Sequence, residues 1–180
     1  RFDVNSAEDL YEGVKAVPWS EHIDPHGTLL VDFVGTNDTI RNSQFGAVKV
    51  KDAIVDCLRD DSGIRPSVAK HNPDIRINAR LSRGTVVVSL DMSGDSLHRR
   101  GYRVKQGAAP MKENLAAALL IRSGWPDIAK AGGALLDPMC GSGTILIEAA
   151  MMAADSAPGS HRQFGFERWL NHQNDQWLDL

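Results

Sequence analysis

The stretch from Leu135 to Thr144 constrains the fold more than any other part of the sequence. Apolar residues over 134–136 predict a short buried strand, Gly141 and Gly143 predict a tight turn, and the apolar run over 144–154 predicts a helix. Small residues let a backbone approach a ligand closely, and a helix N-terminus offers unpaired N–H groups at the positive end of its dipole. This strand–loop–helix unit therefore predicts a site for a polar or anionic group in an α/β domain.

The predicted loop lacks the sequence motifs of two common phosphate-binding sites. A P-loop ends in Gly-Lys-Ser/Thr, and a dinucleotide fingerprint has a third glycine where Leu146 stands. Asp137 follows the predicted strand, where its carboxylate is placed to accept hydrogen bonds from water or from a charged amino-acid group. The ligand is therefore expected to be of another nucleotide type.

The first hundred residues predict a separate arrangement of helices and strands. Helical spacing of apolar side chains predicts helices over 6–17 and 43–60, and β-branched or alternating residues predict strands over 28–34, 75–81 and 85–90. The last two strands are joined by Ser82-Arg83-Gly84 as a β-hairpin. Helix, strand, helix and hairpin is an α+β order.

Positive charge beside glycines places the domain boundary after residue 97, in a linker over 98–109 that contains His98, Arg99, Arg100, Arg103 and Lys105. Beyond it we predict a helix over 111–123 that ends at Gly124, and an amphipathic helix over 167–180. We expect residues 1–97 to be an N-terminally truncated domain and residues 110–180 to be the N-terminal part of an incomplete second domain.

Composition narrows the class of protein. Hydrophobic residues make up 42% and charged residues 24% of the chain, which predicts a packed core. The absence of a long apolar run and the scarcity of cysteine favour a cytoplasmic protein, and the six histidines have no metal-ligand spacing. Because the formal net charge is −3, any contact with RNA must come from a local basic patch.

The segment Asp137-Pro138-Met139-Cys140-Gly141-Ser142-Gly143-Thr144 resembles motif I of the S-adenosylmethionine methyltransferases. It has the Asp-Pro-x-Cys-Gly-Ser-Gly-Thr form of enzymes that methylate exocyclic amino groups of nucleic-acid bases. The resemblance implies S-adenosylmethionine (SAM) as the cofactor, with contacts from Asp137, Pro138, Cys140, Gly141, Ser142, Gly143 and Thr144.

Two further segments extend the likeness over almost the whole chain. Residues 98–103 and 109–117 resemble the join between a THUMP domain and the catalytic domain in bacterial guanine-N2 rRNA methyltransferases, which implies that Pro110, Lys112 and Glu113 contact the cofactor. A helix start with Pro110 before its first turn is the plainer interpretation, and the two are compatible. Residues 37–46 and 49–56 resemble the C-terminal part of a THUMP domain.

The chain is therefore similar to the THUMP-containing 23S rRNA guanine-N2 methyltransferases of bacteria, the large-subunit L/K type. The resemblance implies an α+β THUMP-type domain followed by the beginning of an α/β Rossmann-like methyltransferase domain. It makes 23S rRNA the expected partner, and basic side chains of the first domain the expected phosphate contacts: Arg41, Lys49, Lys51, Arg65, Lys70, Arg76 and Arg80. For any single one of them, an ordinary solvated surface is the alternative.

The expected reaction is methyl transfer from SAM to the exocyclic N2 amine of an unstacked guanine. In amino-methyltransferases an Asn/Asp-Pro-Pro-Tyr/Phe segment after motif I orients the amine, and this sequence contains none. We therefore expect no catalytic residues in this chain and no turnover by the chain alone. A DNA amino-methyltransferase and a non-catalytic RNA-binding protein with a vestigial loop are the alternatives.

Overall fold

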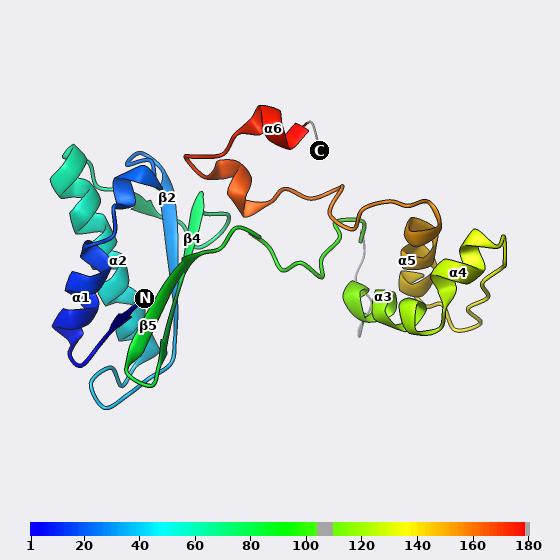
Figure 1. Ribbon diagram of the computed structural model, residues 1–180, viewed down its shortest axis with the longest axis horizontal. Helices are drawn as coiled ribbons and strands as arrows, with labels where there is room; N and C mark the ends of the chain where they lie inside the picture. The colour runs from blue at the N-terminus through cyan, green and yellow to red at the C-terminus, as the bar shows by residue number, and fades with distance from the viewer. Residues whose placement is uncertain (104–109, 179–180) are drawn as a thin grey trace. The chain divides into compact units, whose positions relative to one another are not determined.

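The computed structural model describes residues 1–103 and 110–178. The chain divides into two units, one of Arg1–Gly94 with Phe164–Leu180 and one of Asp95–Gln163. It leaves the first unit after Gly94, builds the second, and returns to the first at Phe164 (Figure 1). Part of the predicted linker, residues 104–109 with Lys105, lies outside the described residues.

A mixed five-stranded sheet organises the first unit. Its strands stand in the order β1-β5-β4-β2-β3, with bounds Phe2–Asp3 for β1, Thr28–Val34 for β2, Ser67–Val68 for β3, Ile75–Ser82 for β4 and Thr85–Leu90 for β5. β2 runs parallel to β3 and β4, and β4 pairs antiparallel with β5. The predicted hairpin is confirmed, and its turn has positive φ at Arg83 and Gly84, as a type I′ turn requires.

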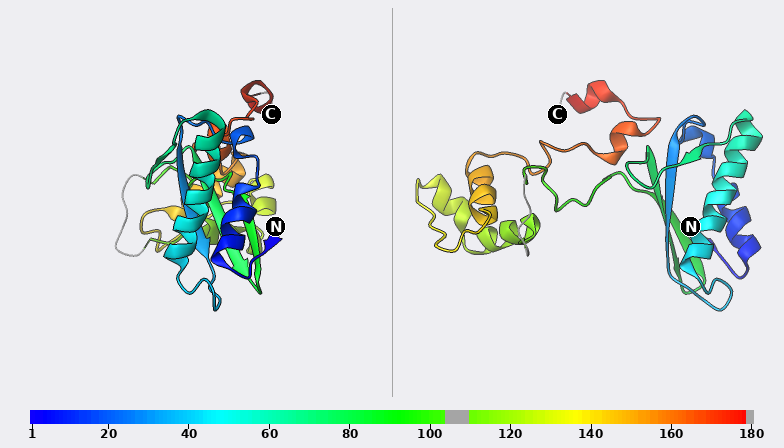
Figure 2. Two further views of the ribbon diagram at one scale, coloured as in Figure 1. Left: turned by 90° about the vertical axis from the view of Figure 1, so that its left-hand side faces the viewer. Right: turned by 180° about the vertical axis from the view of Figure 1, so that it is seen from behind.

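Two helices cover one face of this sheet, as Figures 1 and 2 show. They are α1 (Ala7–Lys15) and α2 (Ser43–Ser62), and a 3₁₀ turn, η1, spans Trp19–Glu21. Alternation along β4 turns Ile75, Ile77, Ala79 and Leu81 toward the helices, where all four are buried. The opposite face presents Arg76, Asn78 and Arg80. The helices, the sheet and their core therefore confirm the α+β prediction for this half of the chain.

Ser6 and Asp9 fix the start of α1 as a reciprocal capping box. The Ser6 hydroxyl accepts a hydrogen bond from the Asp9 N–H at 3.0 Å, and the Asp9 carboxylate accepts one from the Ser6 N–H at 3.0 Å. Asn42 caps α2 by accepting from the Gln44 N–H at 2.7 Å.

The described part of the second unit contains three helices: α3 (Glu113–Arg122), α4 (Trp125–Lys130) and α5 (Thr144–Ala153). The helices predicted over 111–123 and 144–154 are confirmed. Helix α4 was not predicted, because Gly124 followed by Pro126 ends one helix and also starts the next, where Pro occupies a first-turn position. The buried Trp125 indole joins α4 to α5 by donating to the Ala149 carbonyl at 2.9 Å.

Two predicted elements are wrong. Residues 134–136 form no strand, because a strand needs ladder hydrogen bonds and no described residue pairs with this segment, whose Leu136 is 86% exposed. The single helix predicted over 167–180 is replaced by η2 (Gly165–Arg168) and α6 (Asn174–Leu178). Trp169 breaks it with an extended backbone while its ring packs against the core of the first unit and stacks on His22.

No helix within residues 1–103 and 110–178 combines the length and the apolar character needed to span a membrane.

Candidate functional site

The loop from Asp137 to Thr144 keeps a turned conformation through local hydrogen bonds. The Asp137 carboxylate accepts from the Met139 N–H at 3.0 Å, and the Cys140 carbonyl accepts from the Gly143 N–H at 2.7 Å. Gly141 has a φ of +53°, a backbone conformation that side-chain-bearing residues adopt at a cost. The glycine at this position is thus explained by the turn, and it leaves the loop backbone open to a ligand.

The N-terminus of α5 has no side-chain cap. Its N-cap residue is Gly143, and the first amide bonded within the helix is that of Ile147, which donates to the Gly143 carbonyl at 2.8 Å. Among the described residues, no backbone carbonyl accepts from the amides of residues 144–146. These free donors and the positive end of the helix dipole favour a polar or anionic group at the loop.

The residues predicted to contact a cofactor fall into three groups by burial, and Asp137 and Gly143 form the half-buried one. Pro110, Lys112 and the loop residues Pro138, Cys140, Gly141 and Ser142 are exposed. Glu113 and Thr144 are only 6% and 5% exposed, so their side chains face protein and not open solvent. The exposed group lines the surface on which a ligand can lie, and the buried pair belongs to a polar network beneath it.

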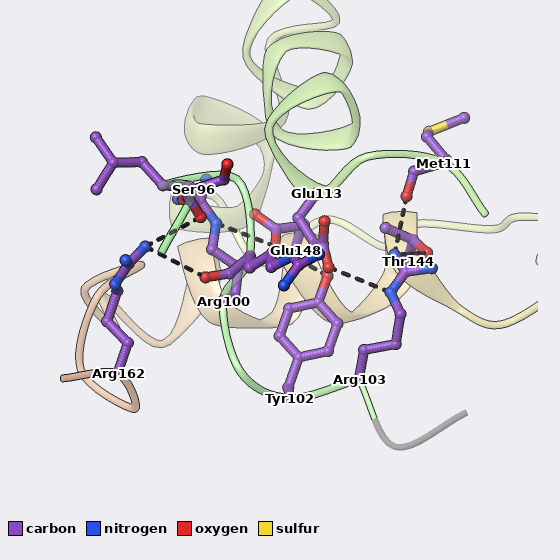
Figure 3. Close-up of polar contacts among 11 residues, drawn as sticks. Ser96, Arg100, Tyr102, Arg103, Met111, Glu113, Thr144, Glu148 and Arg162 are labelled. Carbon is purple, nitrogen blue, oxygen red and sulfur yellow. Dashed lines mark hydrogen bonds and ion pairs between the residues drawn. The ribbon is translucent and has the colours of Figure 1, made fainter. Parts of the chain in front are cut away.

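That network joins the linker to the first turns of α3 and α5 (Figure 3). The Arg103 guanidinium donates from Nη2 to the Met111 carbonyl at 2.8 Å and to the Thr144 hydroxyl at 3.2 Å, and from Nε to the Glu113 carboxylate at 3.2 Å. One arginine therefore contacts the segment before α3, the first residue of α3 and the first residue of α5.

A second carboxylate, Glu148, lies one turn further along α5 and is 3% exposed. It accepts from the Tyr102 hydroxyl at 3.0 Å and pairs with Arg100 at 3.6 Å. Burial, and then the hydrogen bond to Glu148, raise the pKa of Tyr102 well above its ordinary value of 10.0, so its hydroxyl stays a donor at neutral pH. Two arginines and two carboxylates thus meet in a nearly buried cluster of balanced charge.

A pocket of about 380 Å³ is lined by residues from both segments that the sequence singled out on either side of residues 104–109. It is lined by His98, Arg99, Gly101, Arg103, Pro110, Met111, Lys112 and Glu113. Its charged lining consists of the paired Arg103 and Glu113 together with Arg99 and Lys112. No group of three or more His, Cys, Asp or Glu side chains in the described part of the chain is arranged to hold a metal ion.

The seven predicted RNA-binding residues do not form one patch. Arg76 and Arg80 lie on the sheet face away from the helices, whereas Lys49 and Lys51 belong to α2 on the other face. Lys49 pairs with Glu8 at 3.3 Å, Lys51 with Asp52 at 2.6 Å, and Arg76 with Asp32. Arg41 donates to a backbone carbonyl of its own loop, while Arg65, Lys70 and Arg80 are exposed.

The structural role of the linker was not predicted. Its basic block was interpreted as a domain boundary, yet the side chains of Arg100, Tyr102 and Arg103 bond buried carboxylates. The one usable signal was Glu148, a lone acid inside the apolar helix over 144–154, because a buried carboxylate needs a cation or a donor nearby.

Comparisons with known proteins agree with both halves of this description. The THUMP domain family matches residues 4–91, and the family described as RMKL-like, methyltransferase domain matches residues 100–178. Among solved structures, a predicted N6-adenine-specific DNA methylase from Listeria monocytogenes superposes with a TM-score of 0.82 at 31% identity, over 99% of this chain and 46% of that one. A candidate methyltransferase in complex with S-adenosylhomocysteine (SAH) superposes with a TM-score of 0.80 at 32% identity, with the same coverage.

Fold and family matches together define a chain with a THUMP domain followed by a methyltransferase-like domain. The chain belongs to the THUMP-containing, RMKL-like methyltransferase family. The "Ribosomal RNA large subunit methyltransferase K/L" of Cellvibrio japonicus is 71% identical over 99% of this chain, and that of Ectopseudomonas mendocina is 62% identical over 100% of it. The chain spans about a quarter of the length of these curated relatives.

Proposed function

We propose that the full-length protein transfers a methyl group from SAM to the exocyclic N2 amine of a guanine in 23S rRNA. The observation that supports this most directly is the open glycine loop at the uncapped N-terminus of α5. The family match and the rRNA methyltransferases that are 62–71% identical to this chain support the substrate class.

The residues present fit such a cofactor. The exposed loop backbone at Gly141 leaves room for close approach, and the free amides at the start of α5 suit the polar groups of an amino-acid or nucleoside moiety. We assign the binding surface to Asp137, Pro138, Cys140, Gly141, Ser142 and Gly143, with Pro110 and Lys112 beside it. Bound SAM would supply an electrophilic methyl group, and the chain's residues would bind and orient the cofactor that carries it.

RNA contact is assigned to the first unit. The exposed Arg65, Lys70 and Arg80 are free to contact phosphates at little cost, whereas Arg41, Lys49, Lys51 and Arg76 would first exchange their present partners. Such contacts position RNA and do not select its sequence. Guanine selection is therefore assigned to residues beyond those of this chain.

The test is a transfer assay with isotope-labelled SAM, the purified full-length protein and 23S rRNA from cells that lack the enzyme. We expect label in N2-methylguanosine after nuclease digestion and mass spectrometry. Label in another nucleoside, or none in rRNA, would contradict the proposal. The 180-residue chain, assayed in parallel, should give no turnover, because it contains no segment to orient the amine.

A second candidate, methylation of adenine N6 in DNA, draws on the description of the Listeria structure. The THUMP match over residues 4–91 favours RNA over this alternative. The same assay with duplex DNA separates the two candidates. Label in N6-methyl-2′-deoxyadenosine from DNA, with none in rRNA, would favour the second.

A further inference from the structure

We propose that Arg103 is a positioning residue that holds the start of α5, and with it the loop before it, in the arrangement that binds SAM. The inference rests on the proposed function, because it concerns the same cofactor. It assigns a role to the linker, whose basic residues were interpreted from the sequence as marking a domain boundary.

Arg103 is suited to this role by the shape of its side chain. A guanidinium carries donors in a rigid planar fork, so contacts made by its Nε and Nη2 fix each other's geometry. Here the fork meets Glu113, Met111 and Thr144 at distances of 2.8–3.2 Å, with the side chain 13% exposed. The segment of Met111 and Glu113 is thereby tied to the first residue of α5.

The hydrogen bonds of Arg103 are made to residues that adjoin the proposed binding surface. Thr144 is the residue that opens α5, and its hydroxyl also lies 3.3 Å from that of Ser142 in the loop. Met111 and Glu113 flank the exposed Lys112, the other proposed cofactor contact. A shift of either segment would therefore displace groups that must converge on one ligand, and small displacements of such groups weaken binding.

Arg100 provides a matched comparison in the same cluster. It carries the same charge, is 14% exposed, and pairs with Glu148 at 3.6 Å and with the Leu97 carbonyl at 3.2 Å. Among the described residues, it forms no hydrogen bond or ion pair with Thr144 or with the segment before α3. A general loss of stability from disturbing the buried cluster should follow from changing either arginine, whereas a loss of cofactor affinity should follow from changing Arg103.

The experiment is a calorimetric titration of the full-length protein with SAH, for the parent, Arg103→Lys and Arg100→Lys. Lysine keeps a cation opposite each carboxylate but lacks the fork. We expect Arg103→Lys to weaken SAH binding about tenfold, the effect of losing one strong hydrogen bond, and Arg100→Lys to stay within about twofold of the parent. Equal affinities for the two variants would overturn the inference.

A double-mutant cycle with Thr144→Val gives a readout that a merely structural role would not move. If Arg103 acts through Thr144, Arg103→Lys in the Thr144→Val background should change SAH affinity by no more than about twofold. Full additivity would show that the two residues act separately and would overturn the mechanism. If the parent itself fails to bind SAH, the proposed function fails and this inference with it; if the parent binds and Arg103→Lys binds equally, the inference alone fails.

Discussion

Asp9 carries a charge on which the first turn of α1 depends. The backbone N–H of Asn5 donates to its carboxylate at 2.9 Å, and this bond, followed by one with Ser6, lowers the pKa of Asp9 below its ordinary value of 3.8. A carboxyl group with a lowered folded-state pKa stabilises the fold above its unfolded-state pKa, and that contribution is lost as the pH falls through the folded-state value.

Asp9→Asn should therefore lower the thermal unfolding midpoint of the first unit at pH 7. The difference from the parent should shrink as the pH falls below 3.8, because the parent then loses the same charge. Thermal unfolding followed by circular dichroism between pH 2 and 7 measures both effects. Glu12→Gln, on the same helix, is the control, since the Glu12 carboxylate accepts no hydrogen bond from a described backbone N–H, and only its backbone carbonyl accepts, from the Ala16 N–H. A difference that is independent of pH would refute the assignment.

Residues whose role is local were predictable from the sequence, and those that act across the fold were not. Ser6 as an N-cap and Arg83-Gly84 as a hairpin turn follow from neighbours within a few positions. Gly46 is required because a Cβ there would lie 2.6 Å from the Phe33 ring, a contact between α2 and β2 that no local pattern reveals. The role of Arg103 was equally hidden from local patterns, because its hydrogen-bond partner Thr144 lies far along the chain.

Among the elements, the segment over 164–178 departs most from the sequence prediction, because tertiary contacts outweigh its helical spacing. It returns to the first unit, where the Phe166 N–H donates to the Met92 carbonyl at 3.0 Å and Arg168 donates to the Pro73 carbonyl at 3.0 Å. Asn171 donates to the Glu21 carbonyl at 2.8 Å. The close backbone approach also requires Gly165, whose Cβ would lie 2.8 Å from the Asp91 carbonyl oxygen.

Deletion of residues 164–180 should destabilise the first unit without unfolding it, because the buried core between sheet and helices remains. Three lost hydrogen bonds at about 1 kcal/mol each suggest a cost of about 2–4 kcal/mol in the free energy of unfolding, and the lost packing of the Trp169 ring adds to it. Amide hydrogen exchange in β4 and β5 reports that free energy. Deletion of residues 174–180 alone keeps all three bonds and should have a much smaller effect. Equal exchange in both truncations would contradict the role given to the segment.

At the scale of the whole molecule, the sequence predicted two kinds of structure and their order along the chain. The α+β first half is confirmed, and the second half is confirmed as methyltransferase-like by the family match and the superposed structures. The return of the chain to its first unit was not predictable, because it depends on contacts with Met92, Pro73 and Glu21 that exist only when the first unit is folded.

The central claim is that the Asp137–Thr144 loop binds the cofactor of a methyltransferase. Gly141→Val would force a branched side chain into a φ of +53° on the proposed binding surface, and Asp137→Ala would remove the acceptor for the Met139 N–H. Gly132→Val is the control, since Gly132 has a φ of +76°, no atom within 4 Å of an added Cβ, and a place in the turn after α4.

Titration of the full-length protein with SAH is the most direct measurement. We predict that the parent and Gly132→Val bind SAH, that Gly141→Val weakens binding at least about tenfold, and that Asp137→Ala weakens it by a smaller factor. Binding by Gly141→Val and Asp137→Ala with the affinity of the parent would contradict the account.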